Sequence, residues 1–493
     1  MTPQMGTPLT DIMREASRPP EPARPQRPGR SEVPFALAAF AVLCIVVLVA
    51  NPFLVEPDDF AYRASIIGIT EGHLLTLSTA QVQALAAHLD RLGGGGIRVG
   101  LKVGRSIVRS GPVPSRRIGA GPGPVGPLGI PQWVQLSNGR WISEKDPGYP
   151  FLAAPFQALG LIRLAPLFYG ALACLGLFVG ARRWLGRYGG TAAVALFCSS
   201  GAAMLFAWRD YMPTFTDASL IAAGSGALLW VLLANDASRG RRTGVGLLAF
   251  LALEAAVFVR YTDIVVLGCA VLTVVVVWRF SRSTVSTGAL AWWLGSVVLF
   301  GAAVALFDDL VYGGPFKTGY GPGEIEFAFS SILPNFRYMP AHLIEAMPML
   351  FLGIGAVAWI AWRRVRFRAR LASGELAASA RRDFVVALAL AASWFGVWGL
   401  YSAYTWTANP YGTTLQFARF YVPALGAISL LGAYPIVRLT RAARPARFAA
   451  VAIVAALFAL GAWSYDAMRA HGAPINKGPT ITKSAAPHAS RPA

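Results

Sequence analysis

Residues 34–55, PFALAAFAVLCIVVLVANPFLV, are 22 consecutive residues without a charged side chain. A helix of this length is about 30 Å long, which matches the hydrocarbon core of a bilayer. The run is too long for the apolar region of a cleaved signal peptide, and no small-residue cleavage pattern follows it. The sequence therefore predicts an uncleaved membrane anchor.

Comparable apolar runs recur along the rest of the chain. Of the 493 residues, 55% are hydrophobic and 14% are charged, whereas soluble domains carry about 25% charged residues. The mean hydropathy is +0.51. We expect an all-α polytopic membrane protein with about eleven transmembrane helices, the anchor being followed by spans at residues 164–184, 189–206, 218–233, 244–259, 264–278, 288–307, 339–362, 384–404, 421–437 and 448–465.

Polar segments divide the chain into three parts. Residues 1–33 contain seven prolines and five arginines with little apolar periodicity, which predicts a disordered tail. Residues 466–493 contain four prolines and are interpreted in the same way. Between the tails lies one transmembrane domain, residues 34–465, with a large polar first loop at residues 56–148.

The distribution of basic residues predicts the orientation in the membrane. Short loops on the side of the N-terminal tail hold nineteen arginines, whereas those on the other side hold five Arg or Lys residues. Positive loops stay in the cytoplasm, so we expect a cytoplasmic N-terminus, an external first loop and, with an odd number of spans, an external C-terminus. The expected localisation is the cell membrane.

The basic composition does not indicate a nucleic-acid partner. The net charge is +20, but the basic residues are scattered over short loops and do not form one face with interleaved aromatics. The four cysteines all lie in apolar runs, which favours buried small side chains over a disulfide framework or a CxxC metal site.

Acidic residues gather on the predicted external side, where we place 17 of the 24. Several stand where an outgoing helix emerges: Asp58 and Asp59, then Asp210 with Asp217 nearby, then Asp263, and finally Asp308 and Asp309. Aromatic and basic residues accompany them. For any one residue an ordinary interfacial belt is the commoner explanation. Four outgoing helices with the same pattern favour a shared external cavity.

Such a cavity suits glycosyl transfer from a lipid-linked donor. Outside the membrane there is normally no nucleotide sugar, so the donor would be a polyprenyl-phosphate sugar with its phosphate at the interface. Arg and Lys would bind the phosphate and stabilise its charge as it leaves. A partly buried aspartate would act as the base toward an acceptor hydroxyl.

Four motifs stand out along the chain: PDDFAYR at 57–63, EKDPGYPFLAAP at 144–155, YGGPFKTGY at 312–320 and ARFYVP at 418–423. They resemble motifs of the C-type (GT-C fold) integral membrane glycosyltransferases, specifically the superfamily of protein O-mannosyltransferases and lipid A aminoarabinose transferases. The resemblance extends in patches over residues 34–437.

The resemblance implies roles for individual residues. Asp58 matches the first acid of the family's pair, the usual catalytic base, and Asp59 takes the place of the second, a supporting residue or alternative base. Lys145 matches the lysine that approaches the donor phosphate, and Arg419 matches the arginine before a late span. Two departures are Asp146, which replaces a proline, and an insertion at residues 80–137 that does not align.

Further candidates come from position alone. Arg260 lies beside Tyr261 and Asp263 and either binds phosphate or pairs with Asp263. Asp210 and Asp217 either line the acceptor side or bind a cation, although pairing with Arg209 is the commoner explanation for Asp210. Glu254 is in mid-span and should have a partner on a neighbouring helix. Two tyrosines from the motifs complete the predicted cavity, Tyr62 and Tyr320.

We therefore expect an inverting glycosyltransferase that uses a polyprenyl-phosphate sugar, with a glycan, glycolipid or protein as acceptor. The histidines lack ligand spacing, so no metal site is assigned, although some C-type families use a divalent cation. One alternative is a lipid or polysaccharide transporter or flippase, which would show internal repeats and several deep charges. Another is a non-catalytic envelope assembly subunit. The sequence does not identify the sugar, the acceptor or the oligomeric state.

Overall fold

The computed structural model describes residues 32–49, 57–73, 76–91, 115–116, 122–123, 133–136, 139–320, 326–366, 374–408, 412–442 and 444–472. Almost all of the predicted N-terminal tail, residues 473–493 of the predicted C-terminal tail and much of the insertion at residues 80–137 lie outside these ranges.

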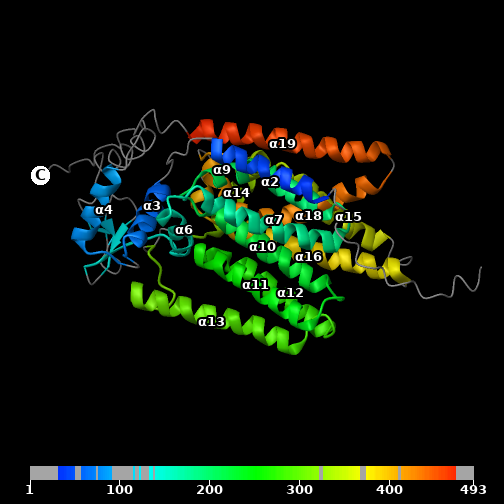
Figure 1. Cartoon of the computed structure of the whole chain (residues 1–493), viewed down its shortest axis with the longest axis horizontal. Coiled ribbons are helices and arrows are strands. Elements are labelled where there is room, and N and C mark those ends of the chain that lie inside the picture. The colour runs from blue at the N-terminus through cyan, green and yellow to red at the C-terminus, as the bar shows by residue number, and fades with distance from the viewer. Residues whose placement is uncertain are drawn as a thin grey trace, which may run out of the picture.

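Long helices form a bundle with a small polar domain at one end (Figure 1). The bundle contains α2 (Glu32–Val49), α6 (Gly148–Ala158), α7 (Leu164–Leu185), α8 (Gly189–Cys198), α9 (Gly201–Trp208), α10 (Thr214–Leu233), α11 (Arg239–Val259), η1 (Tyr261–Asp263), α12 (Ile264–Phe280), α13 (Thr287–Tyr312), η2 (Phe329–Ser331), α14 (Ile332–Ala346), α15 (Leu350–Arg366), α16 (Gly374–Ser402), η3 (Trp406–Ala408), α17 (Thr414–Ala418), η4 (Val422–Ala424), α18 (Leu425–Arg441) and α19 (Arg444–Gly472).

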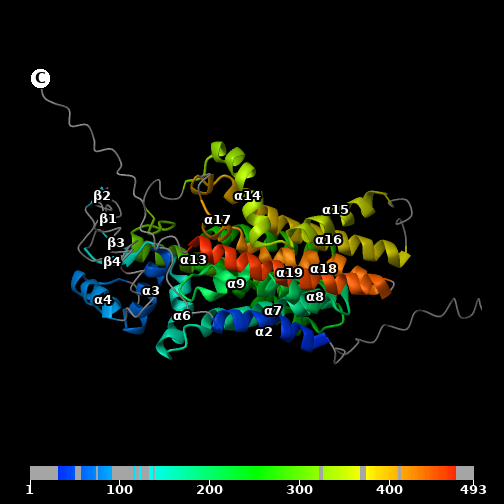
Figure 2. The same cartoon turned by 90° about the horizontal axis from the view of Figure 1, so that it is seen from above.

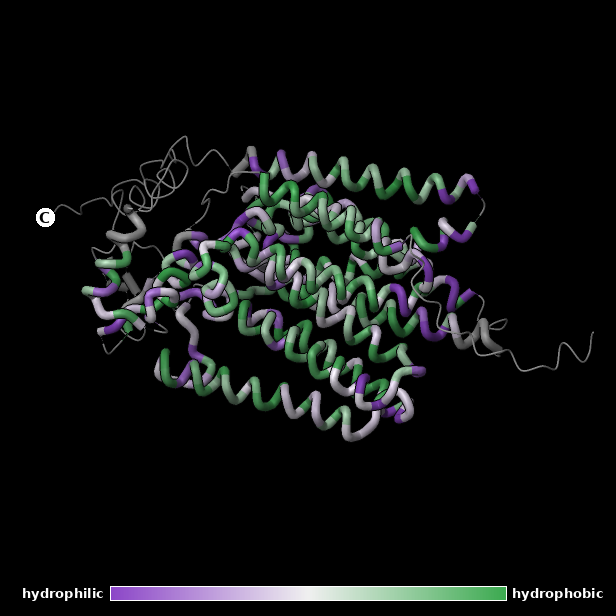
Figure 3. The backbone as a smooth tube through the Cα atoms, viewed as in Figure 1, coloured by the Kyte–Doolittle hydropathy of each residue, from purple (hydrophilic) through white to green (hydrophobic). Residues whose placement is uncertain are grey.

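The polytopic helical fold predicted from the sequence is confirmed. Within the described residues, nine helices are long and apolar enough to cross a membrane, or up to eleven if two bent helix pairs each count as one span. Apolar residues run along the long helices and polar ones gather at the two ends of the bundle (Figure 3).

Two predicted straight spans are broken helices. The span at residues 189–206 is α8 and α9, which meet at 61°, and the span at 339–362 falls in α14 and α15, which meet at 108°. Ser200 is extended and caps α9, and its hydroxyl donates to the Ala346 carbonyl oxygen at 3.1 Å. Met347 precedes Pro348, and a residue before proline avoids helical geometry.

Span ends also differ from the prediction. The anchor begins at Glu32, two residues before the predicted start, and this buried acid forms an ion pair with Arg182 on α7; the described part of the helix runs to Val49. The helix α19 continues to Gly472, so residues 466–472 are helical and not part of a disordered tail. Ion pairing stabilises Glu32 at a helix end, which hydropathy alone does not reveal.

Small residues allow α7 and α10 to pack closely against each other. A side chain at Gly226 would lie 2.2 Å from the carbonyl oxygen of Gly176, and one at Gly180 would lie 2.4 Å from the carbonyl oxygen of Gly226. Small residues let helix backbones approach closely in membranes, where packing drives association.

The polar domain comprises α3 (Pro57–Thr70), α4 (Thr79–Arg91) and a hairpin of β3 (Trp133–Gln135) with β4 (Trp141–Ser143), together with the short pair β1 (Ser115–Arg116) and β2 (Pro122–Gly123). Its apolar core includes Ile67, Leu85 and Trp141. The domain lies beside α6 and the adjoining bundle end (Figure 2). The strand β4 runs through residues 144–147 directly into α6.

Candidate functional site

A cavity of about 460 Å³ lies where the polar domain meets the bundle. The first turn of α3, the segment between β4 and α6, and the loops at the nearby ends of α10, α11 and α16 contribute its walls. Its polar and aromatic lining includes Asp58, Tyr62, Glu144, Lys145, Asp146, Arg260, Tyr261, Tyr320, Tyr401, Tyr404, Trp406, Gln416, Arg419 and Phe420.

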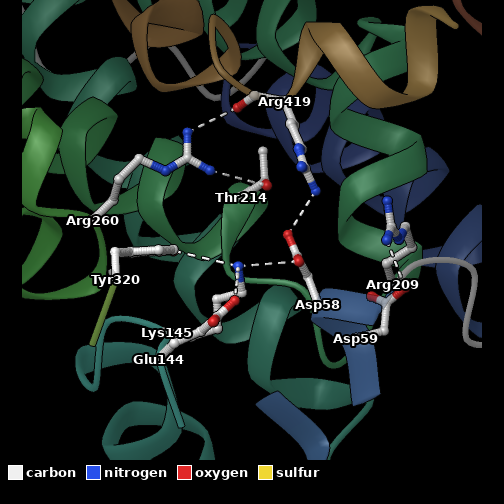
Figure 4. A network of polar contacts seen from close by, with 9 residues as sticks. All are labelled: Asp58, Asp59, Glu144, Lys145, Arg209, Thr214, Arg260, Tyr320 and Arg419. Atoms are coloured by element: carbon white, nitrogen blue, oxygen red, sulfur yellow. Dashed lines mark hydrogen bonds and ion pairs between the residues drawn. The ribbon is translucent and has the colours of Figure 1, made fainter. Parts of the chain in front are cut away.

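Asp58 is held between two cations in this cavity (Figure 4). Lys145 Nζ lies 3.2 Å from Asp58 Oδ1, and Arg419 Nη1 donates to Asp58 Oδ2 at 2.7 Å. Pro57 begins α3 and Asp58 follows in its first turn, where proline and acidic residues are favoured. The three charged side chains come from positions up to 361 residues apart in the sequence.

Lys145 is a buried cation with several partners. Its Nζ lies 3.5 Å from Glu144 Oε1 and 4.9 Å from the centre of the Tyr320 ring, and it donates to the Tyr320 hydroxyl at 3.5 Å. Burial lowers the pKa of Lys145, but Asp58 and Glu144 outweigh this effect and raise the pKa above its usual value. Lys145 is therefore protonated at neutral pH.

The two arginines of the site are fixed by the bundle. Arg260 Nη1 donates to the Arg419 carbonyl oxygen at 2.9 Å and Nη2 to Thr214 Oγ1 at 3.4 Å. The guanidinium of Arg419 lies over the rings of Trp406 and Phe420, 5.1 and 4.8 Å from their centres. Both positive groups are thereby held at the cavity, and their predicted role in phosphate binding stays a prediction.

Asp59 faces the opposite way from Asp58. It is buried, and Arg209 Nη2 donates to its Oδ2 at 2.6 Å. Figure 4 shows this pair on the far side of α3 from Lys145. The expected pairing of Arg209 with Asp210 is therefore wrong, because the α3 turn brings Asp59 closer. Asp210 lies outside the cavity lining, and burial raises its pKa to about 6.

Asp217 contacts the site through Arg260 without lining the cavity. It is fully buried on α10, with its Oδ2 3.6 Å from Arg260 Nε, and it does not line the cavity. The alternative partner proposed for Arg260, Asp263, is also buried beside this group, but the ion pair is with Asp217. Proximity in the sequence favoured Asp263 as the ion-pair partner of Arg260, whereas the packing of α10 against α11 places Asp217 next to Arg260.

Asp146 is a second carboxylate on the cavity wall. Burial raises its pKa to about 7, against the opposing effects of Arg260, Lys145 and the backbone N–H of Tyr261. The sequence comparison noted Asp146 only as a departure from the family's proline. An acidic residue next to Lys145, to which the resemblance assigns the donor phosphate, was the signal that could have identified it.

Aromatic residues form much of the remaining wall. Tyr62 lies edge-on to Tyr149 with ring centres 5.9 Å apart, and both predicted tyrosines, Tyr62 and Tyr320, line the cavity. The contributions of Tyr401 and Tyr404 were missed because the sequence placed them at the end of an apolar span. Flat rings beside polar groups are suited to the apolar face of a sugar.

The other polar predictions have separate outcomes. Ser296 on α13 donates to Glu254 Oε1 at 2.8 Å, so the neighbouring-helix partner expected for this mid-span acid is confirmed. In the described part of the chain, no three His, Cys, Asp or Glu side chains lie together in a way that could hold a metal ion.

The fold and the cavity define an integral membrane protein with a polar site at one end of its helices. Neither a protein-family model nor a curated protein matches the chain. Similar solved structures include ArnT from Cupriavidus metallidurans, a lipid A aminoarabinose transferase of the GT-C fold, the class that the sequence resemblance names.

ArnT bound to undecaprenyl phosphate is 16% identical with a TM-score of 0.45, and apo ArnT is 17% identical with a TM-score of 0.44. Both matches cover 86% of this chain and 63% of the ArnT chain, so this chain spans less than two thirds of the ArnT length. An oligosaccharyltransferase of Archaeoglobus fulgidus in complex with Zn and sulfate is 14% identical, with a TM-score of 0.40, over 66% of this chain and 45% of that one. The likeness is one of fold.

Proposed function

We propose that the protein is a glycosyltransferase that moves a sugar from a polyprenyl-phosphate donor to an acceptor hydroxyl, with inversion at the anomeric carbon. The observation that carries the proposal is the arrangement of Asp58 between Lys145 and Arg419 in a cavity of about 460 Å³. A carboxylate and several cations within one cavity are what this reaction needs.

The cations would bind the donor phosphate. Lys145, Arg260 and Arg419 all line the cavity, and charge-assisted hydrogen bonds from Arg and Lys are strong ligands for phosphate oxygens. When the phosphate binds, Lys145 and Arg419 share their hydrogen bonds with it and release Asp58 from its two ion pairs. Donor binding would thus prepare the carboxylate for its role.

Asp58 would then act as the base. It accepts the proton of the acceptor hydroxyl while the acceptor oxygen forms a bond to the anomeric carbon on the face opposite the phosphate. The bond from that carbon to the phosphate oxygen breaks, and its electron pair leaves with the phosphate, whose added charge the three cations stabilise. Attack from the opposite face inverts the anomeric centre.

We place this reaction at the external face of the cell membrane. Support comes from the arginine distribution, since the end of the bundle away from the cavity carries the arginine-rich loops. The acceptor would then be an envelope glycan, glycolipid or protein. A divalent cation is not part of the proposal.

A direct test uses the purified full-length protein in lipid with radiolabelled polyprenyl-phosphate mannose, glucose and arabinose. We expect the wild type to consume one donor and Asp58→Asn to lose at least about 100-fold in rate. The matched control is Asp309→Asn, which alters an exposed acid at the end of α13. The fold of each variant is checked by thermal unfolding.

The same assay separates the alternatives. A rate in Asp58→Asn equal to that of the wild type would overturn the assignment of the base. Absence of donor binding by the wild type would favour a transporter or an assembly subunit over the enzyme. Donor binding without turnover would indicate that the acceptor is required.

A further inference from the structure

A second cavity, of about 430 Å³, lies between α10, α12 and α16. Most of its walls are aliphatic, with Leu229 and Leu232 from α10, Val266 and Ala270 from α12, and Val386 and Leu390 from α16. Leu229, Val266 and Leu390 are themselves buried. This cavity is separate from the site that contains Asp58.

One end of this groove is strongly basic. Arg381 and Arg382, both exposed, line it near the beginning of α16. Arg382 Nε forms an ion pair with Asp383 Oδ1 at 3.9 Å. Trp184 and Arg438 donate hydrogen bonds to the same carboxylate. The positive charge at this end therefore exceeds the negative charge around it.

Hydroxyl groups lie at the same end. Ser281 and Thr284, in the turn after α12, line the groove and are 2.9 Å apart between Oγ and Oγ1. The beginning of α16 is at the end of the bundle away from the polar domain (Figures 1 and 2). Two guanidinium groups with nearby hydroxyls are suited to a phosphate group at a membrane surface.

The groove is long enough for one acyl chain. Its lining runs from Arg381 to Ser393 on α16, about 18 Å, and from Ser281 to Val266 along α12, about 22 Å at 1.5 Å per residue. Half of the hydrocarbon core of a bilayer, the depth that one acyl chain fills, is about 15 Å. An acyl chain that starts at the arginines would therefore fit within the groove, whereas a polyprenyl chain is much longer.

We propose that this groove binds an anionic phospholipid of the leaflet opposite the Asp58 cavity, with its phosphate on Arg381 and Arg382 and an acyl chain between α10, α12 and α16. The occupant follows from charge complementarity at the mouth and from the aliphatic lining and length of the groove. The site does not depend on the proposed glycosyltransferase activity.

The test measures lipid binding to the purified full-length protein by native mass spectrometry. Phosphatidylglycerol and phosphatidylcholine with identical acyl chains are titrated separately. We expect the wild type to bind phosphatidylglycerol at least about tenfold more tightly, and the double variant Arg381→Gln, Arg382→Gln to lose that difference. The matched control is Arg239→Gln, Arg241→Gln, which removes two exposed arginines at the beginning of α11.

A second variant tests the groove without changing charge. Ala389 lines the groove on α16, so Ala389→Trp should fill it and reduce phosphatidylglycerol binding while thermal unfolding shows a folded protein. Equal binding of the two lipids by the wild type, or equal losses in the Arg381, Arg382 variant and its control, would overturn the proposal. Recovery of polyprenyl phosphate in place of phospholipid, lost in the same variants, would overturn the choice of occupant.

Discussion

Three charged side chains from distant parts of the sequence, Asp58, Lys145 and Arg419, meet in the main cavity. The acidic pair at residues 58–59 divides its roles: Asp58 faces the cavity cations and Asp59 faces Arg209. Sequence reasoning identified both acids and Lys145 as candidate site residues, together with two arginines of the cavity, Arg260 and Arg419. The sequence could not show which of the two acids faces the cavity, because the direction of each side chain depends on how α3 is turned against α9 and α6.

For the proposed donor site, we predict that Lys145→Met lowers kcat/KM for the lipid-linked donor by at least about 100-fold, since it removes a buried cation from the proposed phosphate site. Lys317→Met is the control, because Lys317 is exposed in the neighbouring turn. The measurement is the initial rate of label release over a range of donor concentrations. Equal values for the two variants would contradict a role in phosphate binding.

For the Arg209–Asp59 pair, we predict an effect on stability. Both side chains are about 1% exposed, and removing one member of a buried ion pair costs about 3–5 kcal/mol. Asp59→Asn should therefore lower the thermal unfolding temperature strongly, and the double variant Asp59→Asn, Arg209→Met should recover part of the loss. If both variants unfold like the wild type, the pair is not structural.

For pH dependence, the group to follow is Asp146, whose pKa is raised to about 7 by burial. As the pH falls from 8 to 6, the carboxylate becomes neutral and the cavity more positive, so KM for the phosphodiester donor should decrease. In Asp146→Asn the KM should be low and constant over this range. A pH profile identical to that of the wild type would exclude Asp146 as the titrating group.

The sign for stability follows from the same pKa. The folded-state pKa of Asp146, about 7, exceeds its unfolded value of 3.8. The native state therefore binds more protons between these values, and the contribution of Asp146 to stability falls as the pH rises from about 4 to about 7. The unfolding temperature of the wild type minus that of Asp146→Asn should therefore decrease as the pH rises from about 4 to about 7.

At the scale of elements, apolar runs were enough to predict nearly every long helix, because length and hydropathy are local properties. The breaks within spans were not predicted. Pro348 was a visible signal for the break between α14 and α15, whereas the break at Ser200 depends on its hydrogen bond to Ala346, 146 residues away. Contacts of this kind cannot be derived from periodicity.

The beginning of α6 provides a prediction about elements. A side chain at Gly148 would lie 2.4 Å from the carbonyl carbon and oxygen of Phe258 on α11. Gly148→Ala should push α6 from α11, cost about 1–3 kcal/mol of stability and reduce donor turnover through the adjacent Lys145. Gly268→Ala, where nothing lies within 4 Å, is the matched control. The measurements are thermal unfolding and label release.

At the scale of the whole molecule, the arginine asymmetry predicts the orientation. A cysteine introduced at Glu71, in the turn after α3, should react with a membrane-impermeant maleimide on intact cells. A cysteine at Arg239, at the beginning of α11, should react only after permeabilisation. Both positions are exposed, so accessibility to solvent is matched, and the reverse labelling pattern would invert the assigned topology.

The main cavity is divided between two parts of the molecule. Asp58 and Lys145 belong to the polar domain and its connection to α6, whereas Arg260 and Arg419 belong to loops of the bundle. A small tilt of the polar domain would part Asp58 from Arg419 and leave its contact with Lys145 intact. The Asp58–Arg419 ion pair therefore joins the two parts before the donor binds, and its replacement by the donor phosphate would couple substrate capture to the release of the base.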